Sequence, residues 1–226
     1  MTFGEKVLNF NKTLSLTANL PKGVVVMNPF QDDYVLSLCN QFYTNYYNDS
    51  QKRHIILGIN PGRLGGGLTG IPFTDPVKLE KLCGIQNMLA KKTELSADYI
   101  YLMIAAFGGI GKFYKKFYFN SICPLGFTKE GKNLNYYDIR ELQEAVKDFM
   151  VTSLERQIRF GVNTETAFCL GEGENFKFIS KLNEEYHFFE RIIPLAHPRF
   201  IMQNKRKNVS DYINDYLQKF ELTAKS

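Results

Sequence analysis

The sequence predicts an α/β protein with three layers, in which a central, mainly parallel four-stranded sheet lies between two layers of helices. Two observations indicate this fold class. Short apolar segments alternate along the chain with longer segments whose apolar residues recur at helical spacing. The short segments are apolar almost throughout, as in parallel strands that are covered on both faces. The length of 226 residues suits a single domain over 1–226.

The predicted strands are apolar runs that end at glycine, proline or a polar segment. In chain order they are HIILGI (54–59), KFYFNSICPL (116–125), TAFCLG (166–171) and HFFERIIPL (187–195). The second of them runs into GFTKEGKNLNYYD (126–138), which the sequence predicts to be a long polar loop. Right-handed crossovers would bring the segments that follow the strands together at one edge of the sheet.

The predicted helices have apolar residues at helical spacing and recognisable ends. Pro76 stands behind Asp75 at a helix start, and Ser96 and Gly108 bound another helix. In chain order the predicted helices cover 32–49, 76–92, 96–109, 138–161, 173–186 and 208–221.

The charge of the chain permits a polyanionic partner without requiring one. Lys and Arg number 28 against 23 Asp and Glu, a net charge of +5. The segment RFIMQNKRKN (199–208) is basic and contains Arg199, Lys205, Arg206 and Lys207 but no acidic residue. KFYKKF (112–117) alternates basic and aromatic residues. Each segment fits either a solvated face or a contact with nucleic acid.

Cysteine spacing and hydropathy exclude several classes of protein. Cys39, Cys83, Cys123 and Cys169 form no CxxC pair, which argues against a zinc ribbon, an iron–sulfur cluster and a secreted disulfide frame. We expect four small buried side chains. No apolar run reaches the roughly 18 residues of a membrane helix, and the first residues lack the apolar core of a signal peptide. The expected location is the bacterial cytoplasm, near the nucleoid, or the nucleus if the source is eukaryotic.

The segment GINPGRLGGGLTGIPFTDP (58–76) holds the densest group of glycines in the chain. Gly65, Gly67 and Gly70 fit GxGxxG, but a dinucleotide fingerprint begins at the end of its strand and opens directly into a helix. The Gly-Lys-Ser or Gly-Lys-Thr of a P-loop is absent from the sequence. An enzyme that binds a nucleotide through this loop remains an alternative, and it predicts thermal stabilisation by NAD or ATP.

Three motifs in order carry a more specific resemblance. The glycine-rich segment resembles the first motif of the uracil-DNA glycosylases: an amide just past a strand is followed by Pro-Gly, a glycine arc and Thr-Gly-Ile-Pro-Phe. FNSICPLGF (119–127), GKNL (131–134) and PLAHPRF (194–200) resemble later segments of the single-strand-selective monofunctional branch. The resemblance runs from about residue 54 to 208 and leaves the first fifty residues unplaced.

The resemblance implies a DNA repair enzyme that flips a uracil out of DNA and hydrolyses its N-glycosidic bond, leaving an abasic site. It implies that Asn60 positions the attacking water and that His197 donates a hydrogen bond to O2 of the departing base. Phe73 would stack on the base and Asn120 would read its edge. No metal and no cofactor are implied, and a monomer would suit the reaction. The remaining residues of the implied base pocket are Gly58, Ile59 and Gly62.

The same resemblance assigns a DNA-binding surface and a wedge that fills the gap left by the flipped base. Here the second motif reads His-Pro-Arg, two residues shorter than the His-Pro-Ser-Pro-Arg of the branch, and Arg63 stands where the branch commonly has Pro. The wedge candidates are Phe200, Ile201 and Met202, and the bases expected near DNA are Arg63, Arg199, Lys205 and Arg206. A non-catalytic nucleic-acid-binding protein with the same fold is a second interpretation, and it predicts salt-dependent binding without an abasic product.

Overall fold

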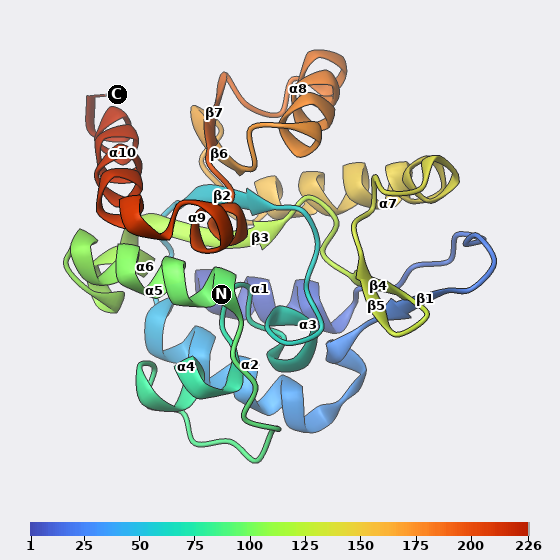
Figure 1. The fold of residues 1–226 in the computed structure, drawn as a ribbon, viewed down its shortest axis with the longest axis horizontal. Coiled ribbons are helices and arrows are strands. Elements are labelled where there is room, and N and C mark those ends of the chain that lie inside the picture. The colour runs from blue at the N-terminus through green and yellow to red at the C-terminus, as the bar shows by residue number, and fades with distance from the viewer. Residues whose placement is uncertain (226) are drawn as a thin grey trace.

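The computed structural model describes residues 1–225, and its centre is a four-stranded parallel sheet with the order β3-β2-β6-β7 (Figure 1). Each neighbouring pair of strands is parallel. The predicted sheet is therefore confirmed, although the last strand begins only at Arg191. The strands are β2 (His54–Gly58), β3 (Phe117–Ser121), β6 (Thr166–Leu170) and β7 (Arg191–Leu195).

Helices cover both faces of this sheet, because successive side chains of each strand point to opposite faces. In β3, Phe117 contacts Phe107, Phe113 and Phe220 from helices on one face. On the other face, Tyr118 contacts Phe3 and Phe160. The first layer contains α5 (Leu95–Phe107), α6 (Ile110–Lys116) and α10 (Val209–Glu221), and the second contains α1 (Phe3–Lys12), α7 (Arg140–Arg159) and α8 (Glu174–Tyr186). The three predicted layers are thus confirmed.

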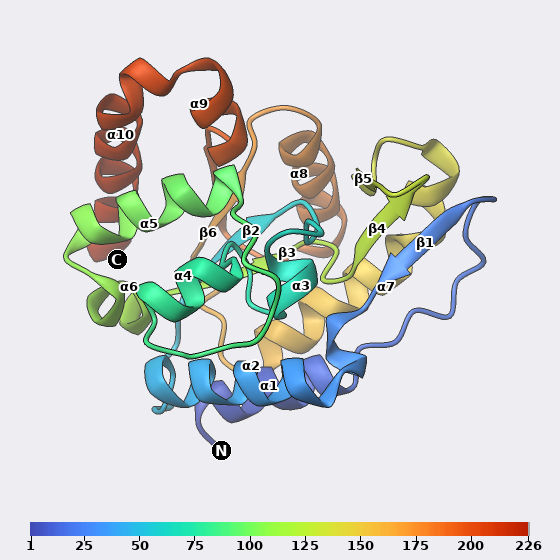
Figure 2. The same cartoon turned by 60° about the horizontal axis from the view of Figure 1, so that its bottom comes forward.

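A second, antiparallel sheet with the order β1-β4-β5 lies to one side of the central sheet (Figures 1 and 2). Its strands are β1 (Val24–Met27), β4 (Gly126–Lys129) and β5 (Lys132–Leu134). The prediction of a loop over 126–138 is therefore wrong. Glu130 and Gly131 both have positive φ, 52° and 71°, as in the tight two-residue turns that match the twist of a hairpin.

One helix is shorter than predicted, and the structure decides between the two alternatives for KFYKKF. Helix α4 (Pro76–Lys81) ends well before residue 92, because the chain turns at Gly84 with a φ of 70°. In KFYKKF, Phe113 and Tyr114 are buried in the core while the lysines of α6 are exposed. This segment is therefore a solvated helix face, and its aromatic rings are not available to stack on bases. The remaining helical elements are η1 (Pro29–Gln31), α2 (Asp33–Tyr46), α3 (Gly66–Thr69), α9 (Pro198–Asn204), η2 (Arg206–Asn208) and η3 (Leu222–Lys225).

All four cysteines are free and buried, as expected. Burial raises the pKa of the Cys83 thiol to about 11, so this thiol is protonated at neutral pH. Over residues 1–225, we find no helix with the length and apolar character needed to cross a membrane.

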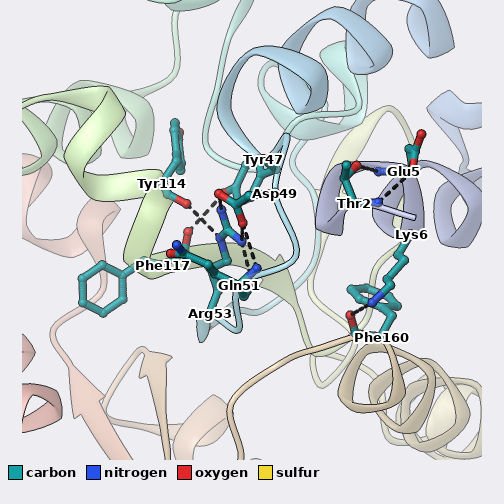
Figure 3. Close-up of polar contacts among 10 residues, drawn as sticks. All are labelled: Thr2, Glu5, Lys6, Tyr47, Asp49, Gln51, Arg53, Tyr114, Phe117 and Phe160. Carbon is teal, nitrogen blue, oxygen red and sulfur yellow. Dashed lines mark hydrogen bonds and ion pairs between the residues drawn. The ribbon is translucent and has the colours of Figure 1, made fainter.

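Arg53 fixes the amino end of the central sheet, where β2 begins. Its side chain is 0% exposed, and Figure 3 shows it pointing toward Asp49. The guanidinium donates to both carboxylate oxygens of Asp49, to the carbonyl of Gln51 and, over 3.1 Å, to the carbonyl of Tyr114. It also lies 5.0 Å and 5.3 Å from the ring centres of Phe3 and Tyr47. This cation therefore ties α1, α2 and α6 to the first strand of the sheet.

Replacing Asp49 with alanine should destabilise the fold strongly, because it leaves a buried guanidinium without its carboxylate. We expect a loss of about 3 kcal/mol in the free energy of unfolding, near the lower end of such cases because Asp49 is partly exposed. Urea titration measures the loss. Glu144→Ala, which removes an exposed ion pair with Arg140, is the control and should cost no more than about 0.5 kcal/mol. Equal denaturation midpoints for the two variants would contradict this account of Arg53.

Candidate active site

A cavity of about 360 Å³ lies where β2, β3 and β7 end at one edge of the central sheet. Ligand sites of α/β proteins are typically found outside the carboxyl ends of such strands. Its walls come from the glycine loop (residues 58–76), the last residue of β3, the strand β5 with the segment after it, the start of α5, and α9. The lining residues are Ile59, Asn60, Pro61, Gly62, Gly66, Pro72, Phe73, Glu94, Ser96, Ser121, Asn133, Asn135, Tyr137, His197, Arg199, Phe200, Gln203 and Asn204.

The glycine loop is braced on itself. Thr69 Oγ1 lies 2.6 Å from the carbonyl oxygen of Thr74 and accepts the Ile71 N–H at 3.2 Å. A Cβ atom on Gly67 would lie only 2.8 Å from the carbonyl oxygen of Gly62. Gly70 ends α3 with a φ of 73°, a conformation that glycine adopts easily. Gly67 and Gly70 thus allow the backbone to double back. Helix α3 has only four residues, unlike the helix that opens from a dinucleotide fingerprint.

Asn60 is held in one orientation by the main chain of the hairpin. Its Nδ2 donates to the carbonyl of Leu134 at 3.1 Å, and its Oδ1 accepts the N–H of Tyr136 at 3.0 Å. These two partners distinguish the amide nitrogen from the oxygen, so the side chain cannot be flipped. An amide oxygen has a second lone pair, which leaves Oδ1 able to accept one more hydrogen bond in the cavity.

Phe73 has a left-handed backbone, with a φ of 54°. This conformation is rare for a bulky residue and is a form of strain that is concentrated at functional sites. The ring lies 5.2 Å from the ring of Phe119 and lines the cavity. A Cβ atom on Gly58 would come within 2.8 Å of the ring edge of Phe73, so glycine at the end of β2 makes room for the ring.

His197 is the N-cap residue of α9, and it is neutral at physiological pH. Its Nδ1 accepts the backbone N–H of Arg199 at 3.2 Å. Because a backbone N–H can only donate, the ring proton of the neutral imidazole lies on Nε2. Burial, assisted by the charge of Arg199, lowers the pKa of His197 to about 4. The site therefore contains a neutral imidazole with a single N–H to donate.

Asn120 does not line this cavity. It is buried on the opposite face of β3, where its Nδ2 donates to Tyr118 Oη at 2.7 Å and to Gln157 Oε1 at 2.6 Å. A strand presents successive residues to opposite faces, so Ser121 faces the cavity instead. Ser121 Oγ also lies near Gly58, 3.4 Å from where a Cβ atom on that residue would stand. The geometry thus argues against Asn120 as the reader of the base edge.

Helix α9 presents one face to the cavity and the opposite face to the core. Phe200 is 46% exposed and lines the cavity together with Gln203 and Asn204, as expected for residues three and four positions apart. Ile201 is 0% and Met202 is 8% exposed. Of the three wedge candidates, only Phe200 is therefore placed to contact a partner.

The basic candidates lie around the opening of the cavity or at the end of α9. Arg63 is exposed, and its backbone N–H donates to Asn133 Oδ1 at 3.1 Å. Arg63 and Arg199 together line a smaller cavity next to the first. Lys205 and Arg206 are exposed just beyond α9. Of the other predicted pocket residues, Ile59 and Gly62 line the cavity, whereas Gly58, the last residue of β2, does not. The carbonyls of Gly58 and Ile59 accept the N–H groups of Ile122 and Cys123.

Sequence reasoning missed several residues of the site. Ser121 could have been found from its place two positions after Phe119, on the same face of β3. Asn133, Asn135 and Tyr137 lie in the segment predicted to be a loop, and their contribution depends on the hairpin. Glu94 has no motif around it, and only the packing of α5 against the glycine loop brings it to the cavity.

Comparison with known proteins matches residues 44–221 to the family model of the uracil DNA glycosylase superfamily. A crystal structure of wild-type SMUG2 from Pedobacter heparinus superposes with a TM-score of 0.97. The two sequences are 48% identical, and the alignment covers 100% of each chain. No curated protein matches the chain.

Proposed function

Because the chain belongs to the uracil DNA glycosylase superfamily, we propose that it is a monofunctional DNA glycosylase that removes uracil by hydrolysis and leaves an abasic site. One observation carries the proposal. Asn60, Phe73 and His197 come from distant parts of the sequence and line one cavity at the carboxyl edge of the sheet. A nucleobase that is swung out of DNA needs such a pocket, because its C1′ atom is inaccessible in a stacked duplex.

Each of these side chains has a separate role in the proposed reaction. Phe73 offers a flat face on which the extruded base stacks, a contact worth about 1–3 kcal/mol. Asn60 orients the attacking water through the free lone pair of Oδ1. His197 donates its Nε2 proton in a hydrogen bond to the oxygen of the base on which negative charge develops. Fixed donors at such positions are often the largest contribution to catalysis.

Ser121 takes the place of Asn120 in the proposed recognition of the base. A hydroxyl both donates and accepts, and its hydrogen rotates to suit its partner. It therefore discriminates less sharply between base edges than an amide with two fixed groups. We infer that the site accepts other deaminated bases besides uracil.

The proposed DNA-binding surface surrounds the opening of the cavity. Arg63, Arg199, Lys205 and Arg206 supply positive charge there, and the exposed ring of Phe200 enters the base stack behind the flipped nucleotide. Binding through these bases would weaken steeply with rising salt.

A direct test uses labelled oligonucleotides that contain one uracil, in single- and double-stranded form. After incubation with the protein, alkali breaks the strand wherever a base has been lost. We expect cleavage at the uracil in the presence of EDTA, and none in the same strand with thymine. Salt-dependent binding without any cleavage would replace this proposal with the non-catalytic interpretation. The same assay with hypoxanthine and xanthine tests the breadth attributed to Ser121.

Replacing Phe73 with leucine should raise the concentration of enzyme needed for half-maximal single-turnover cleavage by about fivefold or more. Leucine keeps an apolar side chain against Phe119 but has no flat face for the base, and a lost stacking contact costs at least about 1 kcal/mol. The titration is run beside a thermal melt, which should show little change. An unchanged half-saturation point would mean that Phe73 is an ordinary packing residue.

A further inference from the structure

The cavity contains one acid that the proposed reaction has not used. Among the described residues that line it, Glu94 alone carries a carboxyl group. Glu94 is the N-cap residue of α5, yet its side chain makes no capping bond to that helix. Its carboxyl instead packs against the glycine loop. A Cβ atom on Gly65 would lie 2.0 Å from Glu94 Oε2, and one on Gly62 would lie 3.0 Å from Oε1.

The backbone of Glu94 is held firmly although its carboxyl is not. Its N–H donates to Asp75 Oδ2 at 3.0 Å. Asp75 is fully buried and also accepts the backbone N–H of Lys78 at 2.8 Å and its ammonium at 3.1 Å. Asp75 stands two residues after Phe73, so one carboxylate ties Glu94 to the segment that carries the stacking ring. By contrast, we find no hydrogen bond or ion pair from the Glu94 carboxyl to any other side chain in residues 1–225.

A reactive carboxylate would supply what Asn60 lacks. An amide can orient a water molecule, but it is too weak a base to take the proton of that water. Glu94 faces the same cavity, and it packs against Gly62, two residues after Asn60. On the basis of the proposed function, we infer that Glu94 is the general base of the reaction and a catalytic residue of this site.

The water oxygen forms a bond to C1′ while the bond from C1′ to the base nitrogen breaks, and that bond's electron pair leaves with the base. The proton of the water passes to the Glu94 carboxylate. The base departs as an anion that accepts a hydrogen bond from His197 and later takes a proton from solvent. Glu94 then releases its proton to solvent. Before the transfer, the carboxylate also stabilises the positive charge that develops on the sugar.

The surroundings of Glu94 suit a base that works near neutral pH. Burial is the main cause that raises the pKa of Glu94 to about 7, and the negative charge of Asp75 adds to it. The cations Arg199 and Lys78 act in the opposite direction, and Asp98 raises the pKa further. Gly62 and Gly65, the loop residues nearest the carboxyl, carry no titratable group, whereas Arg63 lines the smaller neighbouring cavity together with Glu94. The ionised form therefore increases as pH rises through about 7, and so should the rate.

The test compares single-turnover release of uracil by the wild type and by Glu94→Gln between pH 5.5 and 9. The wild-type rate should rise with a midpoint near 7. Glu94→Gln should lower the plateau by about 100-fold or more and abolish this rise, because general base catalysis contributes about 10²- to 10⁴-fold. Glu144→Gln removes one exposed carboxylate elsewhere and should change neither quantity.

A second variant distinguishes a chemical role from a structural one. In Glu94→Ala, added formate should restore part of the rate in proportion to its concentration, while formate should not affect the wild type. Wild-type rates in Glu94→Gln would overturn the inference. So would a faster rate of this variant above pH 7, which would mean that the carboxylate repels DNA phosphate. If Glu94→Gln fails to fold, either a flat wild-type pH profile or the absence of rescue by formate is sufficient to overturn the inference. If the wild type releases no base at all, the proposed function itself fails.

Discussion

Replacing His197 with alanine should lower the single-turnover rate of uracil release by about 10²- to 10³-fold, the usual effect of removing one donor that faces developing negative charge. The imidazole is neutral with its proton on Nε2, so the variant should lose the hydrogen bond that we propose from this proton to the departing base. Rapid-quench measurements with enzyme in excess isolate this step from product release.

Two further variants make the result specific to the ring proton. His197→Asn keeps a side chain that can cap α9, and it should therefore fold normally while it remains as slow as His197→Ala. His187→Asn changes an exposed histidine at a left-handed position that asparagine tolerates, and it should be fully active. A His197→Asn enzyme that retains the wild-type rate would remove His197 from the mechanism.

The depressed pKa of His197 gives this prediction a pH dependence. An unfolded histidine gains a proton below about 6.5, whereas the folded one stays neutral down to about 4. The unfolded state therefore binds more protons in this window, and His197 reduces the stability of the fold as pH falls through it. Between pH 5.5 and 9 the ring does not titrate, so the deficit of His197→Ala should be constant, unlike that of Glu94→Gln.

Replacing Asn60 with alanine should slow the same step by about 100-fold or more, because a misplaced water loses the advantage of a fixed geometry of attack. The variant also frees the carbonyl of Leu134 and the N–H of Tyr136. The single-turnover rate measures the first effect, and amide hydrogen exchange at residue 136 measures the second. Asn214→Ala, at an exposed site on α10, controls for the loss of an amide. A normal rate together with faster exchange would assign Asn60 to the structure alone.

The fold class was predictable because the central strands are apolar almost throughout and the helices have clear ends. The second sheet was not predictable, since its three strands are short. The polar residues of β4 and β5 are typical of a loop, and β1 is a run of only four apolar residues in a part of the chain that no motif placed. The only local sign of the hairpin was the glycine after Glu130. The surrounding segment is polar and lacks a clear alternation of apolar and polar residues, so this sign is easy to miss.

In the candidate site, too, residues marked by local sequence were predictable, and residues placed by long-range packing were not. Asn60, Phe73 and His197 follow strands or lie in a marked loop, and their convergence follows from the parallel topology. Asn120 failed as a cavity residue because one position along a strand reverses the face, which a motif comparison does not resolve. Glu94 reaches the cavity through the packing of α5 on the glycine loop, which no local pattern encodes.

The hydrogen bonds between Asn60 and the main chain of the hairpin constrain which changes of sequence the hairpin tolerates. Backbone groups at 134 and 136 hold the amide, so substitution of hairpin side chains leaves both hydrogen bonds in place. Insertion or deletion of one residue between β4 and β5 would instead shift both groups out of reach. Homologues that keep an asparagine at this position should therefore conserve the number of residues in the hairpin more strictly than their identity.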